Sequence, residues 1–263
     1  MKGVLHVHSD FSDGELSLAA LRDAYVALGY RFACLTDHAE YFDEDEARRY
    51  RDESARLSDD TFLFVPGLEY ECPDRLHVLG LGTTTLHATR VPEGVIGAIE
   101  DEGALSIVAH PRTQDFARVE ALGVLPTGIE AWNSKYDGRY APRTETFALV
   151  RRLRARDPRV RATFGQDLHF RRQYLGLHVE LRDATLDRAA ILGALRAGRY
   201  VAVSGELRLE ADGSLAPQVA ERFDALHQRT RRLRRLAGGT KAFLDSLGLT
   251  IPPRLKTQLR RLF

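Results

Sequence analysis

The stretch LHVHSDFSDG, residues 5–14, continues the apolar start of the chain and places two histidines one residue apart. The run from Gly3 to His8 otherwise has the composition of a buried β-strand. Alternate residues of a strand point to the same face, so His6 and His8 would present their rings together. Asp13 follows in the adjoining loop. Ionisable groups gathered at one strand end indicate that something is bound there.

Strand-like runs alternate with amphipathic, helix-like segments through residue 204. The apolar runs occupy 3–8, 32–37, 61–70, 77–82, 105–110, 128–133, 161–166 and 200–205. The amphipathic segments occupy 16–29, 43–58, 95–103, 141–156 and 185–198. This alternation predicts an α/β fold of parallel strands with crossover helices, and the number of units favours a barrel over an open sheet.

The charge balance divides the chain near Gly205. The whole chain has 263 residues with 38 Lys and Arg against 37 Asp and Glu. Residues 205–263 hold 12 of the basic and 6 of the acidic residues, about +6, which leaves 26 against 31, about −5, for residues 1–204. We therefore predict a barrel over 1–204 and a basic helical extension over 205–263, either packed on or beside the barrel or free to bind a partner.

The composition excludes several classes of protein. The balanced total charge gives no general preference for nucleic acid or anionic membranes. Two cysteines are too few for a disulfide framework. The N-terminus has no signal-peptide pattern and no apolar run approaches 18 residues, so we expect a cytoplasmic protein without a membrane partner.

Most histidines and several carboxylates fall at the ends of predicted strands. The residues in question are His6, His8, Asp13, Asp37, His38, Glu69, His77, His110, Asp167 and His169. In a barrel these ends meet at one rim, where clustered carboxylates would repel one another unless cations lie between them. A nitrogen and oxygen donor set without thiolates suits Zn, Mn or Fe. Taken singly, each residue has a structural alternative: a lone histidine as a hydrogen-bonded core residue, Asp13 as a helix cap, Asp167 as a turn cap.

The motifs HVHSDFSDG, LTDHAEY, GLEYE, HVLGLG, AHPR and GQDLH resemble those of the PHP (polymerase and histidinol phosphatase) superfamily, in order and over residues 3 to about 204. The resemblance implies a distorted (β/α)7 barrel, here with a C-terminal helical extension, that holds two or three divalent metal ions. Only 32 residues separate His77 from His110. The HVLGLG run is most similar to the TrpH-like branch, but this spacing leaves room for one crossover helix only and not for the small inserted domain of that branch. The AEYF sequence after His38 also departs from the common pattern.

The resemblance implies three overlapping metal sites. His6, His8, Glu69 and Asp167 match the first site. Glu69 matches the bridge to a second site that His77 and His110 complete, and the third site matches Asp13, His38 and His169. Asp37 matches a position that usually supports the ligands, and we expect it to orient His6 or His8.

The implied reaction is hydrolysis of a phosphate ester, with a small phosphorylated molecule or nucleotide as substrate. Asp37 is a candidate proton donor, and Arg112 and Arg139 are candidate phosphate contacts because guanidinium groups match phosphate oxygens. Lys135 and Arg143 in the same loop, and Arg171 and Arg172, are further options. Two alternatives remain: a phosphodiesterase or nuclease that uses the basic tail, and a metal-bound scaffold without activity. The substrate and the oligomeric state are not readable from the sequence.

Overall fold

The computed structural model describes residues 1–137, 142–173, 176–229 and 232. It divides into two units, Met1–Leu215 and Ala216–Phe263. The predicted boundary between residues 204 and 205 falls in the turn between the last two strands of the first unit. In the second unit, residues 217–229 are helical. Residues 230–231 and 233–263 of the predicted basic extension lie outside the described residues.

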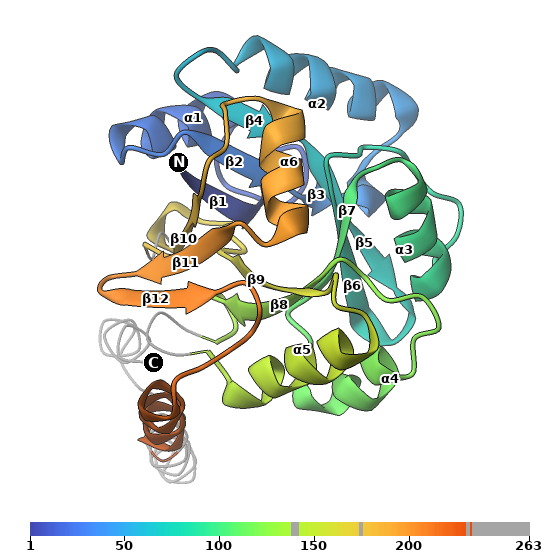
Figure 1. The fold of residues 1–263 in the computed structure, drawn as a ribbon. Coiled ribbons are helices and arrows are strands. Elements are labelled where there is room, and N and C mark those ends of the chain that lie inside the picture. Colours follow the sequence, from blue (N-terminus) through green and yellow to red (C-terminus); the bar gives the residue numbers. More distant parts are fainter. Residues whose placement is uncertain (138–141, 174–175, 230–231, 233–263) are drawn as a thin grey trace, which may run out of the picture. The chain divides into compact units, whose positions relative to one another are not determined.

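The wall of the first unit consists of strands that follow one another in chain order (Figure 1). They are β1 (Lys2–Val7), β2 and β3 (Phe32–Leu35, Asp37–His38), β4 and β5 (Leu63–Val65, Gly67–Cys72), β6 (Leu76–Leu81), β7 (Leu105–Ala109), β8 (Gly128–Asn133) and β9 (Arg161–Gly165). Thr36 separates β2 from β3, and Pro66 separates β4 from β5. Each of these pairs therefore occupies one place in the wall.

Hydrogen bonds connect the strands into two sheets, β12-β11-β10-β1-β2-β4 and β3-β5-β6-β7-β8-β9. The chain after β9 returns to β1, where the Gln166 amide donates to the Leu5 carbonyl (3.0 Å) and Val7 forms a parallel bridge with Leu168. The wall thus runs from β1 through β9 and back to β1. The α/β class and the distorted barrel-like order of strands agree with the prediction.

The connection between β5 and β6 corrects the expectation of parallel strands throughout. Only the 3-10 turn η2 (Pro73–Arg75) separates the two strands, whereas a parallel crossover needs a dozen residues or more. Accordingly β6 is antiparallel to both β5 and β7. This reversal brings His77, at the start of β6, to the rim where the neighbouring strands end. In the register His77 lies opposite Glu71 on β5 and Ala109 on β7.

Three further strands extend the first sheet beyond β1. β10 (His178–Leu181) pairs antiparallel with the first half of β1, and β11 (Tyr200–Ser204) and β12 (Leu207–Glu210) continue the antiparallel order. The sequence predicted β11 but neither β10 nor β12. Because the first half of β1 pairs with β10, its second half is left to meet the segment after β9.

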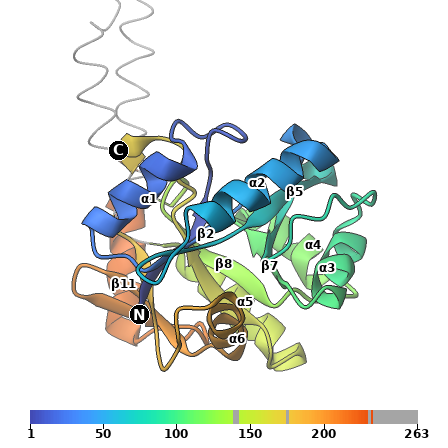
Figure 2. The same ribbon diagram turned by 90° about the horizontal axis from the view of Figure 1, so that it is seen from above.

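Helices lie outside the strands in both views (Figure 1, Figure 2). They are α1 (Leu18–Ala27), α2 (Glu44–Arg56), α3 (Pro92–Asp101), α4 (Phe116–Glu120), α5 (Thr144–Arg156) and α6 (Arg188–Ala197), with short 3-10 turns η1 (Ala39–Tyr41), η3 (Thr113–Asp115) and η4 (Arg171–Gln173). The Ser17 hydroxyl accepts from the Ala20 amide and caps α1. Among the described residues, no helix has the length and apolar character needed to cross a membrane.

Candidate metal centre

Glu69 lies at the middle of a cluster of histidines, of which His6 and His8 are buried and His77 and His110 half-buried. Its Oε2 is 3.1 Å from Nε2 of both His6 and His8. Its Oε1 is 2.5 Å from His77 Nδ1 and 3.2 Å from His110 Nε2. Burial by itself would raise the pKa of Glu69, but the surrounding histidines, His6 first, hold it well below the usual value. One carboxylate oxygen thus faces each pair of imidazoles, which is the arrangement of a bridging ligand.

Asp167 and His169, on the segment after β9, approach the same cluster. Asp167 Oδ1 lies 3.8 Å from His6 Nε2 and 3.7 Å from His8 Nε2. Asp167 Oδ2 lies 3.9 Å from His110 Nε2. His169 Nδ1 is 3.1 Å from Asp167 Oδ1. Asp167 therefore faces the imidazoles that also surround Glu69.

Asp13 gathers a neighbouring group on the more exposed side. Its Oδ1 lies 3.2 Å from His169 Nε2, 3.6 Å from His8 Nδ1 and 3.8 Å from His38 Nε2. Ser17 caps α1, and the Asp13 carboxylate faces histidines, so the alternative of Asp13 as the helix cap is wrong. The structure brings together all nine residues that the motifs predict as ligands.

The donor atoms are close enough to share cations. Four groups each have their potential ligand atoms within 4.8 Å of one another. These groups are His8, Asp13, His38 and His169; His6, His110 and Asp167; His6, His8 and Glu69; and His38, Glu69 and His77. Overlapping clusters of imidazoles and carboxylates suit divalent metal ions.

His8 provides an independent test of whether a metal fits. Both of its ring nitrogens are buried and lack a hydrogen bond among the described residues, although Nε2 lies 3.1 Å from Glu69. Burial lowers the pKa of His8. A neutral, buried imidazole with unsatisfied nitrogens is costly unless another group uses its lone pair. A divalent ion at this position would satisfy that requirement.

Glu130 orients the His6 ring through a hydrogen bond. Its Oε1 accepts from His6 Nδ1 (2.8 Å), which leaves Nε2 of that ring directed at Glu69. Its Oε2 accepts from the His110 amide (2.8 Å) and from Asn133 Nδ2 (2.9 Å). Sequence reasoning missed Glu130. A carboxylate inside the otherwise apolar run GIEAWN was the available signal.

Buried carboxylates also determine the protonation of His6. Burial alone would lower the pKa of this ring, but Glu130, Asp167 and Glu69 together raise it well above the ordinary value. The side chain of His6 is fully buried and shares its Nε2 surroundings with Glu69 and Asp167. The cluster therefore attracts positive charge, whether a proton or a metal ion supplies it.

Asp37 does not orient either histidine. Its Oδ1 accepts from the Ser9 amide (2.7 Å) and from the Ser12 hydroxyl (2.6 Å), and its Oδ2 accepts from the Ser9 hydroxyl (2.9 Å). The expectation that Asp37 orients His6 or His8 is thus wrong. Glu130 accepts from His6 Nδ1, and the ring nitrogens of His8 have no hydrogen bond among the described residues. Asp37 instead fixes the loop that carries Asp13.

The predicted cations have different surroundings. Arg112 follows His110 and Pro111, but its side chain is 48% exposed and bonds Asp115 on η3. Arg139 lies outside the described residues. Lys135, an option in the sequence, lies at the cluster: its Nζ is 3.2 Å from Asp167 Oδ1 and 3.2 Å from His169 Nε2.

Asn133 fixes the turn that presents Lys135. Its Oδ1 accepts from the backbone amides of Lys135 (3.0 Å) and Tyr136 (3.1 Å). Its Nδ2 donates to Glu130 Oε2 and to Asp167 Oδ2 (3.0 Å). A single amide thus connects the buried carboxylates with the loop after β8.

Comparisons with known proteins support the fold. No family model matches the chain. A stretch of 41 residues, 16% of the chain, is 42% identical to the DNA polymerase/3'-5' exonuclease PolX of Bacillus subtilis (strain 168), of which it covers 7%. The chain therefore spans only a small part of that relative.

Two solved structures resemble most of the chain. One is a two-domain protein from Bacteroides vulgatus ATCC 8482 that contains a predicted PHP-like metal-dependent phosphoesterase. It has a TM-score of 0.55 and 18% identity, and the match covers 79% of this chain and 66% of that one. The other is PsfC from Pseudomonas syringae PB-5123, with a TM-score of 0.54, 18% identity, and coverage of 88% and 97%. The chain therefore shares its α/β fold with these two structures, one of which contains a predicted PHP-like phosphoesterase.

Proposed function

We propose that this protein is a metal-dependent hydrolase of phosphate esters that acts on a small phosphorylated molecule. The observation that carries the proposal is the position of Glu69, with four imidazoles within 3.2 Å of its two oxygens. The PHP-like phosphoesterase in the Bacteroides structure shares this fold. The nine residues at the cluster would hold two or three ions of Zn, Mn or Fe.

The chain supplies positioning and charge for this chemistry. When bound, divalent ions polarise phosphoryl oxygens and lower the pKa of a water molecule. Glu130 orients His6, and Asp37 fixes the loop of Asp13. The Lys135 ammonium lies beside Asp167 and His169, where it can bind an oxygen of an entering phosphate. In this proposal Lys135 takes the part predicted for Arg112, whose side chain bonds Asp115 instead, and the phosphate contact of Arg139 stays a prediction.

The first test combines metal analysis with hydrolysis of p-nitrophenyl phosphate. We expect at least two equivalents of transition metal per chain and activity that EDTA removes and Mn or Zn restores. Glu69→Gln should lower the metal content, because it removes the negative charge shared by two sites. The rate of hydrolysis should fall by about a hundredfold or more. Fewer than two equivalents in the wild-type protein would contradict the multi-metal proposal.

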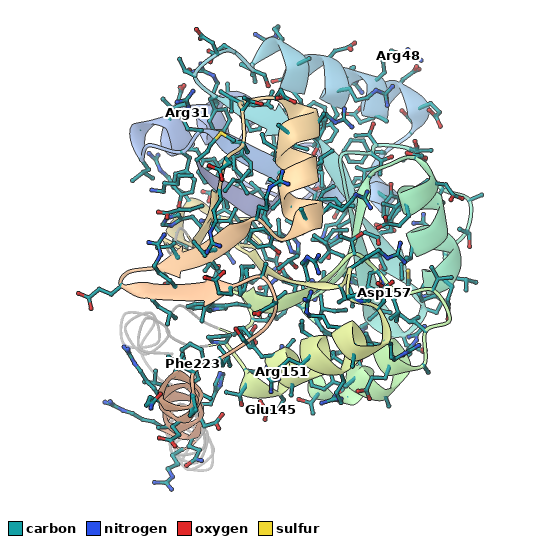
Figure 3. The ribbon with its side chains drawn as sticks, viewed as in Figure 1. Arg31, Arg48, Glu145, Arg151, Asp157 and Phe223 are labelled. Atoms are coloured by element: carbon teal, nitrogen blue, oxygen red, sulfur yellow. The ribbon has the colours of Figure 1, made fainter. Side chains whose placement is uncertain are left out.

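Glu145→Gln is the matched control. Glu145 lies in the first turn of α5, and its side chain is exposed (Figure 3). The same chemical change there should leave metal content and rate as in the wild type. A comparable loss in both variants would show that the effect of Glu69→Gln is not specific to the cluster.

A phosphodiesterase or nuclease is the second candidate. The short match to PolX favours it, because that relative is named as a DNA polymerase and exonuclease. A diesterase should hydrolyse bis-p-nitrophenyl phosphate faster than the monoester. If the basic residues after Gly205 hold nucleic acid, affinity for an oligonucleotide should also fall steeply between 50 and 200 mM salt. Preference for the monoester with weak oligonucleotide binding would leave the first candidate.

A further inference from the structure

The exposed aromatic side chains of the described residues are all at the candidate metal centre. Among large hydrophobic residues, Tyr41 is 58% exposed, Tyr136 56% and Phe170 39%. The other exposed members of this class are aliphatic: Val26, Leu28, Val91 and Val124. A ligand that covered these rings would gain the free energy of burying them.

Each of the three rings stands next to a different histidine of the centre. The ring centroids are 4.8 Å apart for Tyr136 and His110, 6.3 Å for Tyr41 and His38, and 6.4 Å for Phe170 and His169. These three histidines lie directly after β7, on β3 and on the segment after β9. An exposed aromatic ring therefore lies beside each of three histidines of the cluster, and we name Tyr41, Tyr136 and Phe170 the aromatic rim.

Cations accompany two members of the aromatic rim. Lys135 Nζ lies 5.3 Å from the ring centroid of Tyr136, and Arg172 Cζ lies 4.9 Å from that of Phe170. Lys135 also reaches Asp167 and His169 in the cluster. A ligand placed over the rim would thus meet positive charge for an anionic group and flat apolar surface for a ring.

We propose that the aromatic rim binds a planar aromatic group in the alcohol part of the substrate, so that the substrate is a phosphate ester of an aromatic or heterocyclic alcohol. This inference rests on the proposed phosphoesterase function and narrows its substrate class. A phosphate at the cluster would place the esterified alcohol near the three exposed rings. Stacking on such rings contributes binding without requiring a particular hydrogen-bond pattern.

A small substrate fits the rim better than a nucleic-acid strand. Proteins that bind single strands stack successive bases on aromatic residues spaced along a basic groove. The described part of the chain exposes aromatic rings only at these three positions, so a strand would find no further stacking partners there. The rim therefore suits one aromatic group next to one phosphate.

The test compares benzyl phosphate with cyclohexylmethyl phosphate, using the full-length, metal-loaded protein. The two esters have the same carbon skeleton, and only the first is planar. We expect kcat/KM to favour benzyl phosphate roughly tenfold, which corresponds to about 1.4 kcal/mol. Binding of the non-hydrolysable benzyl- and cyclohexylmethyl-phosphonates, measured by calorimetry, should show the same preference. A ratio near one in both measurements would overturn the proposal.

Variants locate the preference on the rim. In the double variant Tyr136→Leu/Phe170→Leu, bulk and apolar character remain but planarity is lost, so the tenfold ratio should fall toward one with metal content unchanged. Tyr136→Phe should retain the ratio. Val124→Ala, which precedes β8 at the end opposite Asn133, should also retain it. A ratio that survives the double variant would place the preference elsewhere and overturn the role of the rim. If the wild type hydrolyses neither ester with any metal, the phosphoesterase proposal itself fails.

Discussion

Three residues of the candidate centre hold backbone conformations that side chains rarely adopt. The φ angles of His6, Asp167 and His110 are 61°, 51° and 30°, in the region that favours glycine. The remaining non-glycine residues with positive φ among those described are Asp74, Arg75 and Asp183. Such conformations cost free energy and persist where the surroundings impose them, which is common at functional sites. The strain thus marks the same residues as the chemistry.

Gly165 is required by the close approach of Glu130 to His6. A Cβ atom at Gly165 would lie 1.8 Å from Glu130 Oε1 and 2.8 Å from the Cβ of His6. We expect Gly165→Ala to displace the Glu130 carboxylate from His6 and to lower metal affinity about 10- to 100-fold. The same overpacking should lower the free energy of unfolding by about 1–3 kcal/mol. Metal titration and thermal denaturation measure the two effects.

Gly193 provides the control for this substitution. It lies within α6, and a Cβ there would meet nothing within 4 Å. Gly193→Ala should therefore stabilise the protein by about 0.5–1 kcal/mol and leave metal affinity unchanged, because alanine favours the helix. Equal metal affinity in the Gly165→Ala variant and the wild type would show that Glu130 does not depend on the missing side chain.

At the scale of elements, the sequence predicts where the wall strands lie, but it predicts only part of the pairing between strands. The apolar runs gave seven places in the wall because buried strands are continuous and apolar. The antiparallel β6 was also within reach, since three residues cannot make a parallel crossover. β10 and β12 have only four residues each, too few for a periodic pattern. They are strands because they pair with β1 and β11, and the sequence of each segment by itself carries no information about such pairing.

Glu100 connects several elements and carries a pH dependence. Its carboxylate, at the end of α3, accepts from Ser106 on β7 (2.6 Å), from Thr127 before β8 (2.6 Å) and from Arg196 on α6 (2.7 Å). Burial would raise the pKa of Glu100, but these hydrogen bonds lower it overall. Since the folded-state pKa is below the unfolded one, the ionised group stabilises the fold fully above the unfolded pKa, about 4.3, and progressively less below it.

We therefore expect Glu100→Gln to lower the free energy of unfolding by about 1–3 kcal/mol at pH 7. The difference from wild type should shrink as the pH falls below about 4.3, toward the folded-state pKa. Denaturant titrations at pH 7, 5 and 4 measure this, and titration of the histidine cluster cancels because both proteins contain it. The exposed change Glu145→Gln should cost little at any of these pH values. A difference that stays constant with pH would exclude an ionic contribution from Glu100.

At the scale of the whole molecule, the candidate centre depends on contacts between distant parts of the chain. The ordered motifs predicted the nine ligand positions, and the fold brings them to one rim. The supporting residues were less predictable. Glu130 and His6 are 124 positions apart, and only the three-dimensional fold shows that their side chains meet. Likewise, the sequence indicates Lys135 only as one of several cations in the loop. The fold shows that the turn held by Asn133 places this lysine beside Asp167.

Metal binding should stabilise the whole first unit, because the proposed ligands lie on β1, β3, β5 and β6 and on the segments after β1, β7 and β9. Without cations the buried Glu69 and Asp167 carboxylates lie close to Glu130, and their repulsion opposes folding. An ion that binds only the folded state contributes RT ln(1 + [M]/Kd), about 2.7 kcal/mol at a hundredfold excess over Kd. The melting temperature of EDTA-treated protein should thus rise by several degrees on adding Mn or Zn and continue to rise with the logarithm of free metal. Glu69→Ala should abolish most of this rise, whereas Glu145→Gln should show the full effect. A melting temperature independent of metal in the wild type would contradict a centre shared by all these strands.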